Sequence, residues 1–262
     1  MTSGSSNHGF AKRALFHGIA AAAILVAPIL RCHLVLARRD HREWMYPIDA
    51  PRVVVPGADQ LRILIIGDSA AAGFGIRTHQ LGVAGYLARR LASHTGRGVD
   101  IQIEAAISMT ARCAPKLIEA AAAHSYDAII LMLATNDAMS LTANDTWRRN
   151  MSRSLALLQS IAPSSGFVTT VADVGAIGRL APLTRLICGR HAQVLNRTLA
   201  QLCARTGHTL THLDPAQSLD SSTYRKWANS IATSLVPTIE PALARLPSPA
   251  FAPVRPGYAS VA

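Results

Sequence analysis

The chain has few cysteines and few aromatic residues. Four of its 262 residues are cysteine and 5% are aromatic. No two cysteines form a C-x-x-C pair, which argues against a zinc site, and we expect no metal and no cofactor. Cys188 and Cys203 fall on one predicted helix about four turns apart, too far to bridge each other. We therefore expect buried free thiols at Cys32, Cys113, Cys188 and Cys203, and they leave the redox compartment open.

Acidic residues are also scarce, and this scarcity makes the chain strongly basic. The formal net charge is +11 at neutral pH. The lysines and arginines are scattered, without a basic run interleaved with aromatic residues and without a nucleic-acid-binding motif. Nucleic acid is therefore not an expected partner. An anionic membrane surface fits better, because several of the charges flank an apolar segment near the N-terminus.

That apolar segment predicts a membrane anchor or a signal sequence. Residues 14–30 are apolar except for His17 and Gly18, and the apolar pattern resumes after Arg31. Its length is at the short end for a spanning helix, which needs about 20 residues. We expect an uncleaved single-pass anchor over residues 14–37, with a cleavable signal peptide as the alternative.

The side of the membrane on which the domain lies is left open by the flanking charges. The count of lysine and arginine on the two flanks keeps the C-terminal side in the cytoplasm. The usual export of anchored domains of this kind favours the opposite side. We expect an exported domain, with the cytoplasmic orientation as the alternative.

The remaining chain divides by composition. Residues 1–13 form an N-terminal tail, and the proline-containing stretch 38–60 is typical of a linker. The alternation of secondary structure places one folded domain at residues 61–236. Beyond it, residues 237–262 are rich in proline and alanine without a periodic pattern, so we expect a disordered tail.

Within the domain, apolar β-branched runs alternate with helical patterns. This alternation implies parallel βαβ units and a three-layer α/β/α sandwich with a five-stranded parallel sheet. Right-handed crossovers limit the topology, and a flavodoxin-like strand order is the first expectation. We expect strands at 61–66, 99–105, 127–134, 167–173 and 208–213, and helices at about 80–94, 112–124, 144–162, 183–206 and 221–235.

Two strand ends supply residues suited to acyl transfer. The first strand runs into Gly67-Asp68-Ser69, and the third ends at Ala134-Thr135-Asn136-Asp137. Parallel strands open on the same sheet edge, so the Ser69 hydroxyl and the Asn136 amide are expected to face one pocket. Acyl transfer needs a nucleophile and donors aimed at the developing oxyanion. Ser69, with its backbone N–H, and the Asn136 amide fit these roles, whereas Asp68 is expected to fix the turn.

These blocks resemble the SGNH (GDSL-type) hydrolase family, and most closely its membrane-anchored bacterial members. The resemblance covers about residues 60 to 235 and includes a Trp-containing helix start at Thr146–Arg149. It implies a flavodoxin-like fold and hydrolysis of esters, thioesters or acetylated sugars without a metal. It also implies Ser69 as the nucleophile and Asn136 as an oxyanion donor, with Ala134 where the family has a glycine.

The second block of the family departs from its pattern here. The family uses a glycine backbone N–H as an oxyanion donor, and Met109 occupies that position. A backbone N–H survives this exchange, so Met109 stays a candidate donor. A positive φ at this position would disfavour methionine, and we expect its side chain to intrude on the pocket.

The last block departs further. The family has Asp-x-x-His shortly before a Tyr and a Trp-Ala pair, which Tyr224 and Trp227 match. An ungapped count places Pro215 at the aspartate position and Ser218 at the histidine position. One inserted residue would bring Asp214 to the aspartate position, but it restores no histidine.

Two histidines are candidate substitutes for the missing general base. His212 lies near the carboxyl end of the last predicted strand, two residues before Asp214, and His79 follows the first block. General-base catalysis contributes typically 10²–10⁴-fold, so its loss predicts a weak enzyme.

The sequence therefore predicts a serine esterase or deacylase that acts on an acylated lipid or an envelope glycan. The alternative is a catalytically degenerate protein that binds an acylated or carbohydrate ligand without turnover. An inert structural protein is a third class, which would require a filled pocket.

Overall fold

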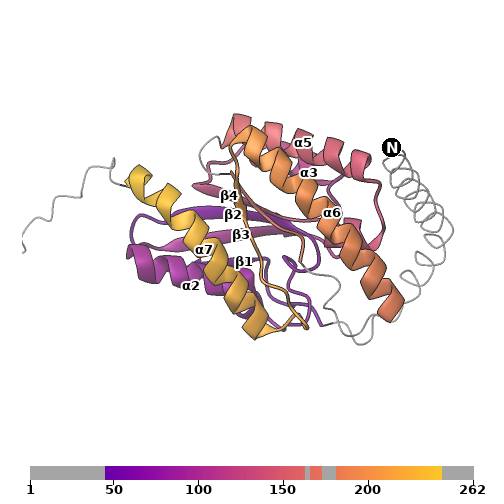
Figure 1. The fold of residues 1–262 in the computed structure, drawn as a ribbon. Coiled ribbons are helices and arrows are strands. Elements are labelled where there is room, and N and C mark those ends of the chain that lie inside the picture. Colours follow the sequence, from indigo (N-terminus) through magenta and orange to yellow (C-terminus); the bar gives the residue numbers. More distant parts are fainter. Residues whose placement is uncertain (1–44, 163–165, 173–180, 244–262) are drawn as a thin grey trace, which may run out of the picture.

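A computed structural model describes residues 45–162, 166–172 and 181–243 of the chain (Figure 1). Its sheet has six strands in the order β1-β3-β2-β4-β5-β6. The strands are β1 (Arg52–Val55), β2 (Leu61–Gly67), β3 (Val99–Ala105), β4 (Ala128–Met132), β5 (Gly166–Thr169) and β6 (Thr209–Thr211).

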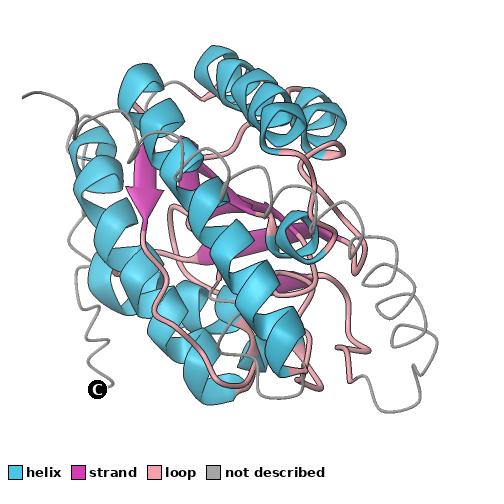
Figure 2. Cartoon of the chain, turned by 45° about the vertical axis from the view of Figure 1, so that its right-hand side comes forward, coloured by secondary structure: helices cyan, strands magenta, loops and turns pink. Residues whose placement is uncertain are grey.

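Helices cover both faces of this sheet, as Figures 1 and 2 show. One face packs against α2 and α7, and the other packs against α3, α5 and α6. The three-layer α/β/α sandwich is therefore confirmed. The helices are α2 (Val83–Thr95), α3 (Ala114–Ala121), α4 (Thr135–Met139), α5 (Asn144–Ile161), α6 (Pro182–Thr206) and α7 (Ser221–Leu243), with a short 3₁₀ helix, η2 (His79–Leu81).

The five predicted strands have the expected flavodoxin-like arrangement. Strands β3, β2, β4, β5 and β6 are all parallel, with β2 between β3 and β4. In chain order this is 2-1-3-4-5, the order of flavodoxin-type folds. Their carboxyl ends consequently share one edge of the sheet, where the two candidate blocks begin.

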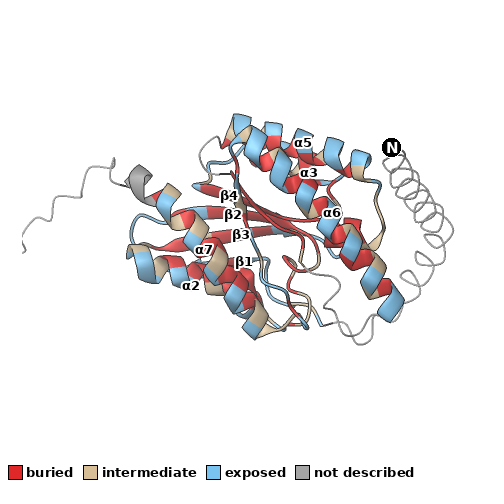
Figure 3. Ribbon diagram, viewed as in Figure 1, coloured by how far each residue is buried: buried red, intermediate tan, exposed pale blue. Residues whose placement is uncertain are grey.

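Strand β2 is buried because both of its faces meet hydrophobic cores. Leu64 and Ile66 point toward the α5 and α6 side, whereas Ile63 and Ile65 point toward α2 and α7. Figure 3 shows the resulting band of buried residues through the centre of the sheet. An almost continuous apolar run is what a central parallel strand requires.

The prediction of a five-stranded sheet with a linker over 38–60 is corrected by β1. This strand pairs antiparallel with β3 at the edge of the sheet. Its Arg52 guanidinium donates two hydrogen bonds to the Asp100 carboxylate, at 2.8 and 2.6 Å. The strand escaped prediction because it has four residues between Pro51 and Pro56, and prolines at strand ends are compatible with an edge position.

The predicted boundary of the C-terminal tail is also corrected, because α7 continues to Leu243. Prolines disfavour helix interiors, so the sequence predicts the end of the domain just before Pro237. Leu235 and Ile239 are nonetheless buried in the core between α7 and the sheet. This packing keeps the last turns helical in spite of the proline, because tertiary contacts outweigh local propensity.

The predicted anchor over 14–37 and the chain after Leu243 lie outside the described residues. Within the described ranges, no helix combines the length and the hydropathy needed to cross a membrane. Cys188 and Cys203 are buried free thiols, as expected. Cys113 is exposed, because it lies in the turn that precedes α3, so the expectation of burial is wrong for this residue.

Candidate active site

Ser69 lies in a turn at the carboxyl end of β2 and is partly exposed. Its carbonyl oxygen accepts a hydrogen bond from the Phe74 N–H at 3.0 Å, which closes the turn. Within the described ranges, neither the Ser69 hydroxyl nor its backbone N–H makes a hydrogen bond. Both groups therefore remain able to contact an incoming carbonyl group.

Asp68 connects the Ser69 turn to the second strand end. Its buried carboxylate accepts hydrogen bonds from the backbone N–H groups of Ala70 at 3.2 Å and Thr135 at 2.8 Å. Burial raises the pKa of Asp68 to about 6, although the Ala70, Thr135 and Asn136 N–H groups favour its charged form. Asp68 thus fixes the Ser69 turn, as expected, and also holds α4 against it.

Ala134 makes the sharp turn from β4 into α4. Its φ is 91° and its ψ is 0°, a left-handed conformation that glycine adopts far more readily than alanine. This is the position at which the resemblance noted in the sequence implies a glycine. The turn starts α4 directly at the carboxyl edge of the sheet, so that Thr135 and Asn136 face the Ser69 turn.

Asn136 is buried and binds the neighbouring loop. Its side-chain nitrogen donates hydrogen bonds to the carbonyl oxygens of Ile107 and Met109, each at 2.8 Å. An amide group has two hydrogens, and both point at backbone carbonyls here. Asp137 reinforces this contact because its carboxylate accepts the Ala111 N–H at 2.8 Å. Asn136 therefore lies next to the predicted site but directs its donors to the protein itself.

Met109 belongs to the same loop and is also engaged. Its N–H donates to the Ala106 carbonyl oxygen at 3.0 Å. Met109 does not have a positive φ, so a methionine side chain causes no backbone strain at this position. Its side chain packs in the core on the α3, α5 and α6 side of the sheet. The expected intrusion into an open pocket is therefore wrong, because the core offers the side chain a buried position.

The serine turn, the asparagine helix and the loop that contains Met109 lie together at the carboxyl edge of the sheet. A model of the GDSL-like lipase/acylhydrolase family matches residues 65–234. The chain belongs to this family. Its members are serine ester hydrolases, and the match begins within β2 and continues into α7.

Solved structures of similar fold agree with this assignment. An aryl esterase from M. smegmatis has a TM-score of 0.55 at 16% identity, over 68% of this chain and 99% of that one. Est24, a carbohydrate acetylesterase from Sinorhizobium meliloti, gives the same values. The esterase EstA from Pseudoalteromonas sp. has a TM-score of 0.52 at 14% identity, over 70% and 99%. At such identities the likeness shows the fold alone. Among curated proteins, no sequence matches this GDSL-like chain significantly.

The two candidate acid–base residues after β6 are exposed. His212 and Asp214 point to solvent, whereas Leu213 between them lines a small cavity of about 10 Å³ beside Asp68. The Asp214 carbonyl oxygen accepts the indole N–H of Trp227 at 2.9 Å, which ties this loop to α7. Among the described residues, no hydrogen bond joins either side chain to Ser69. Strand β6 is three strand spacings from β2, about 14 Å.

His79 has a different partner. Its ring Nδ1 lies 2.9 Å from an Asp49 carboxylate oxygen, and that carboxylate also accepts the His79 backbone N–H at 3.0 Å. The histidine is buried, and the pair joins the segment before β1 to η2. The sequence does not predict this contact, because Asp49 lies in the stretch 38–60 that is expected to be a linker. No hydrogen bond connects His79 to Ser69 in the described chain.

The loop before α7 is held by hydrogen bonds to Asp220. Ser218, at the histidine position of the ungapped count, donates its hydroxyl to the Asp220 carboxylate at 2.6 Å. Asp220 also accepts the N–H groups of Ser222 and Thr223, at 2.9 and 3.0 Å, so it caps the start of α7. These bonds, that of Ser218 above all, hold the pKa of Asp220 well below its usual range.

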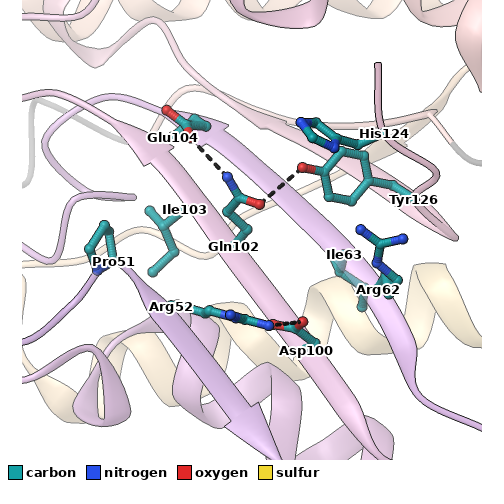
Figure 4. Close-up of a pocket in the computed structure, with 10 residues that line it drawn as sticks. All are labelled: Pro51, Arg52, Arg62, Ile63, Asp100, Gln102, Ile103, Glu104, His124 and Tyr126. Carbon is teal, nitrogen blue, oxygen red and sulfur yellow. Dashed lines mark hydrogen bonds and ion pairs between the residues drawn. The ribbon is translucent and has the colours of Figure 1, made fainter. Parts of the chain in front are cut away.

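A larger hollow of about 420 Å³ lies elsewhere, on the face of β1 and β3 (Figure 4). Its polar groups bind one another: Gln102 donates to Glu104 and accepts from the Tyr126 hydroxyl, both at 3.0 Å. None of the candidate site residues lines it. In the described chain, no group of three or more His, Cys, Asp or Glu side chains could hold a metal ion.

Proposed function

We propose that this GDSL-family chain is a slow acyl-ester hydrolase in which Ser69 is the nucleophile. The observation that supports the proposal is the position of Ser69. It is partly exposed at the carboxyl end of β2, and its hydroxyl and N–H are free of hydrogen bonds within the described residues. The family match supplies the reaction class.

In the proposed reaction, Ser69 Oγ attacks the carbonyl carbon of an ester and loses its proton to solvent. The alcohol leaves with a proton and an acyl group stays on Ser69. Water then attacks this acyl-enzyme, releases the carboxylic acid and restores the hydroxyl. The Ser69 N–H is the proposed hydrogen-bond donor to the oxyanion. It is the single proposed donor while the Asn136 amide donates to the carbonyl oxygens of Ile107 and Met109.

The expected rate is low for two separate reasons. A missing oxyanion donor costs about 10²–10³-fold in kcat. A missing general base costs typically another 10²–10⁴-fold, and no histidine is hydrogen-bonded to Ser69 in the described residues.

The substrate is proposed to be an acylated lipid or an envelope glycan. The apolar segment over 14–37 is proposed to anchor the chain in a membrane, with the domain on the exported side. The pattern of that segment and the basic charge of the chain support this location. Protease digestion of intact cells tests it, because an exported domain is cut and a cytoplasmic one is protected.

Hydrolysis of short p-nitrophenyl esters by the full chain tests the proposed activity. We expect slow release of p-nitrophenol above the rate in buffer, and no such release from Ser69→Ala. Ser160→Ala is the matched control, because Ser160 is exposed on α5 and, among the described residues, its hydroxyl bonds only the Leu157 carbonyl oxygen. Equal rates for the wild type and Ser69→Ala would contradict the proposal.

A second candidate is binding of an acylated or carbohydrate ligand without turnover. Two observations favour it: Asn136 uses both amide hydrogens on carbonyls, and Ser218, which the residue count aligns with the family's histidine, is bonded to Asp220. Calorimetry with a medium-chain fatty acid and with an acetylated monosaccharide separates the candidates. Binding without ester hydrolysis, equal in the wild type and Ser69→Ala, would establish this second function.

A further inference from the structure

Helix α6 exposes apolar side chains along one line of its surface. Leu183 is 60% exposed, Leu186 is 55% exposed and Val194 is 40% exposed. Three arginines and a glutamine lie on the same line. Together with the apolar residues they recur every three or four positions, which is the spacing of a single helix face. The line consists of Leu183, Leu186, Arg190, Val194, Arg197, Gln201 and Arg205. In Figure 3, pale blue marks the exposed residues along α6.

The same helix is basic. It contains four arginines and no aspartate or glutamate over Pro182–Thr206. The neighbouring helix α5 adds exposed arginines, of which Arg148 and Arg153 are paired with acidic residues. The positive charge beside the apolar stripe therefore comes from α6 itself, and it has the sign of the net charge of the whole chain.

The apolar end of α6 lies close to the candidate site. On the inner side of the helix, Cys188 Sγ is 4.0 Å from the Met139 carbonyl oxygen at the end of α4. One turn further, His191 Nε2 is 2.8 Å from the Thr142 carbonyl oxygen. The exposed leucines therefore flank the part of α6 that contacts the segment following Asn136.

We propose that the outer face of α6 docks on the surface of an anionic lipid bilayer. The leucines enter the boundary between headgroups and acyl chains, and the arginines reach the phosphate layer along their apolar stems. An apolar stripe bordered by arginines is typical of helices that bind anionic membrane surfaces. The proposed docking is a contact of the folded domain itself and does not depend on the predicted anchor.

The test measures the environment of α6 in the full chain. A polarity-sensitive NBD dye is attached to Leu186→Cys in a background in which Cys32 and Cys113 are replaced by serine. The matched control is Asn229→Cys, an exposed position on α7 across the sheet. Vesicles contain phosphatidylcholine alone or with about one third phosphatidylglycerol, whose negative charge recruits basic helices.

We expect a blue shift, and quenching by lipid-borne doxyl groups, at position 186 with anionic vesicles and at neither position with neutral ones. Each arginine near the surface contributes a factor of roughly five to the local binding equilibrium. Replacing Arg190, Arg197 and Arg205 with glutamine should therefore abolish the shift. No shift at position 186, equal shifts at 186 and 229, or a shift with neutral vesicles would overturn the proposal. Circular dichroism confirms that each variant is folded.

Discussion

The Asp68 carboxylate accepts a hydrogen bond from the Thr135 backbone N–H at 2.8 Å. This buried contact joins residues next to Ser69 and Asn136, which are far apart in the chain. Because Asp68 also accepts the Ala70 N–H, one side chain sets both the serine turn and the start of α4. The relative position of the two candidate functional residues therefore depends on a third, buried residue.

Replacing Asp68 with asparagine should change how stability depends on pH. Burial raises the pKa of Asp68 to about 6, so the folded state holds its proton more tightly than the unfolded state. Its contribution to stability is complete below the unfolded pKa and is lost as pH rises through about 6. The free energy of unfolding of the wild type, relative to Asp68→Asn, should fall by about 2 kcal/mol between about pH 4 and about pH 7. Urea titrations measure it, and a flat or rising difference would contradict the raised pKa.

Replacing Asn136 with alanine should loosen the loop that contains Met109. The variant leaves the Ile107 and Met109 carbonyl oxygens without their donor, at a cost of about 1–3 kcal/mol. Denaturant unfolding checks the stability, and hydrogen exchange should speed up over residues 106–111. The exposed Asn229→Ala on α7 is the control and should change neither quantity. An Asn136→Ala protein with wild-type stability and exchange would contradict the positioning role.

Ala134 and Ala128 give a matched pair of alanine-to-glycine substitutions on β4 and its exit. Both alanines are buried, but only Ala134 has a positive φ, at 91°. At Ala134, relief of the left-handed strain offsets the lost methyl group and the added chain entropy, so stability should change by less than about 1 kcal/mol. At Ala128, no relief of strain offsets these costs, so the glycine substitution should lower the free energy of unfolding by about 1.5–2 kcal/mol. Equal losses at both positions would show that Ala134 is not strained.

His212→Ala should leave slow ester hydrolysis nearly unchanged. The side chain is exposed and follows β6, three strand spacings from β2. Initial rates with p-nitrophenyl acetate are expected to change by less than about threefold, against the 10²–10⁴-fold loss typical of a general base. A hundredfold loss would instead identify His212 as the base, reached through a rearrangement of its loop.

Most of the sheet could be predicted from the sequence because its strands are apolar runs separated by helical patterns. The burial of Leu61–Gly67 on both faces explains why its pattern was clear. Strand β1 and helix α4 were not predicted, because segments of four and five residues are too short to show a period. Their conformation depends on partners distant in the chain, such as β3 and Asp68.

The candidate site was predictable in part. Ser69 and Asn136 follow strands that end on one edge, so their proximity follows from the parallel sheet. The hydrogen-bond partners of Asn136 could not be predicted in this way. Ile107 and Met109 lie 29 and 27 residues away, and no local sequence pattern links them to Asn136. The residue count identified Ser218 at the histidine position, but only the structure pairs its hydroxyl with Asp220.

Mass spectrometry of the full chain after incubation with p-nitrophenyl acetate is the most direct test of Ser69 as the nucleophile. If Ser69 is the nucleophile, one acetyl group should accumulate on the peptide that contains it, slowly because no described histidine is bonded to it. Ser69→Ala should take up none, and Ser160→Ala should behave as the wild type. A folded wild-type protein whose Ser69 peptide stays unmodified would contradict the account.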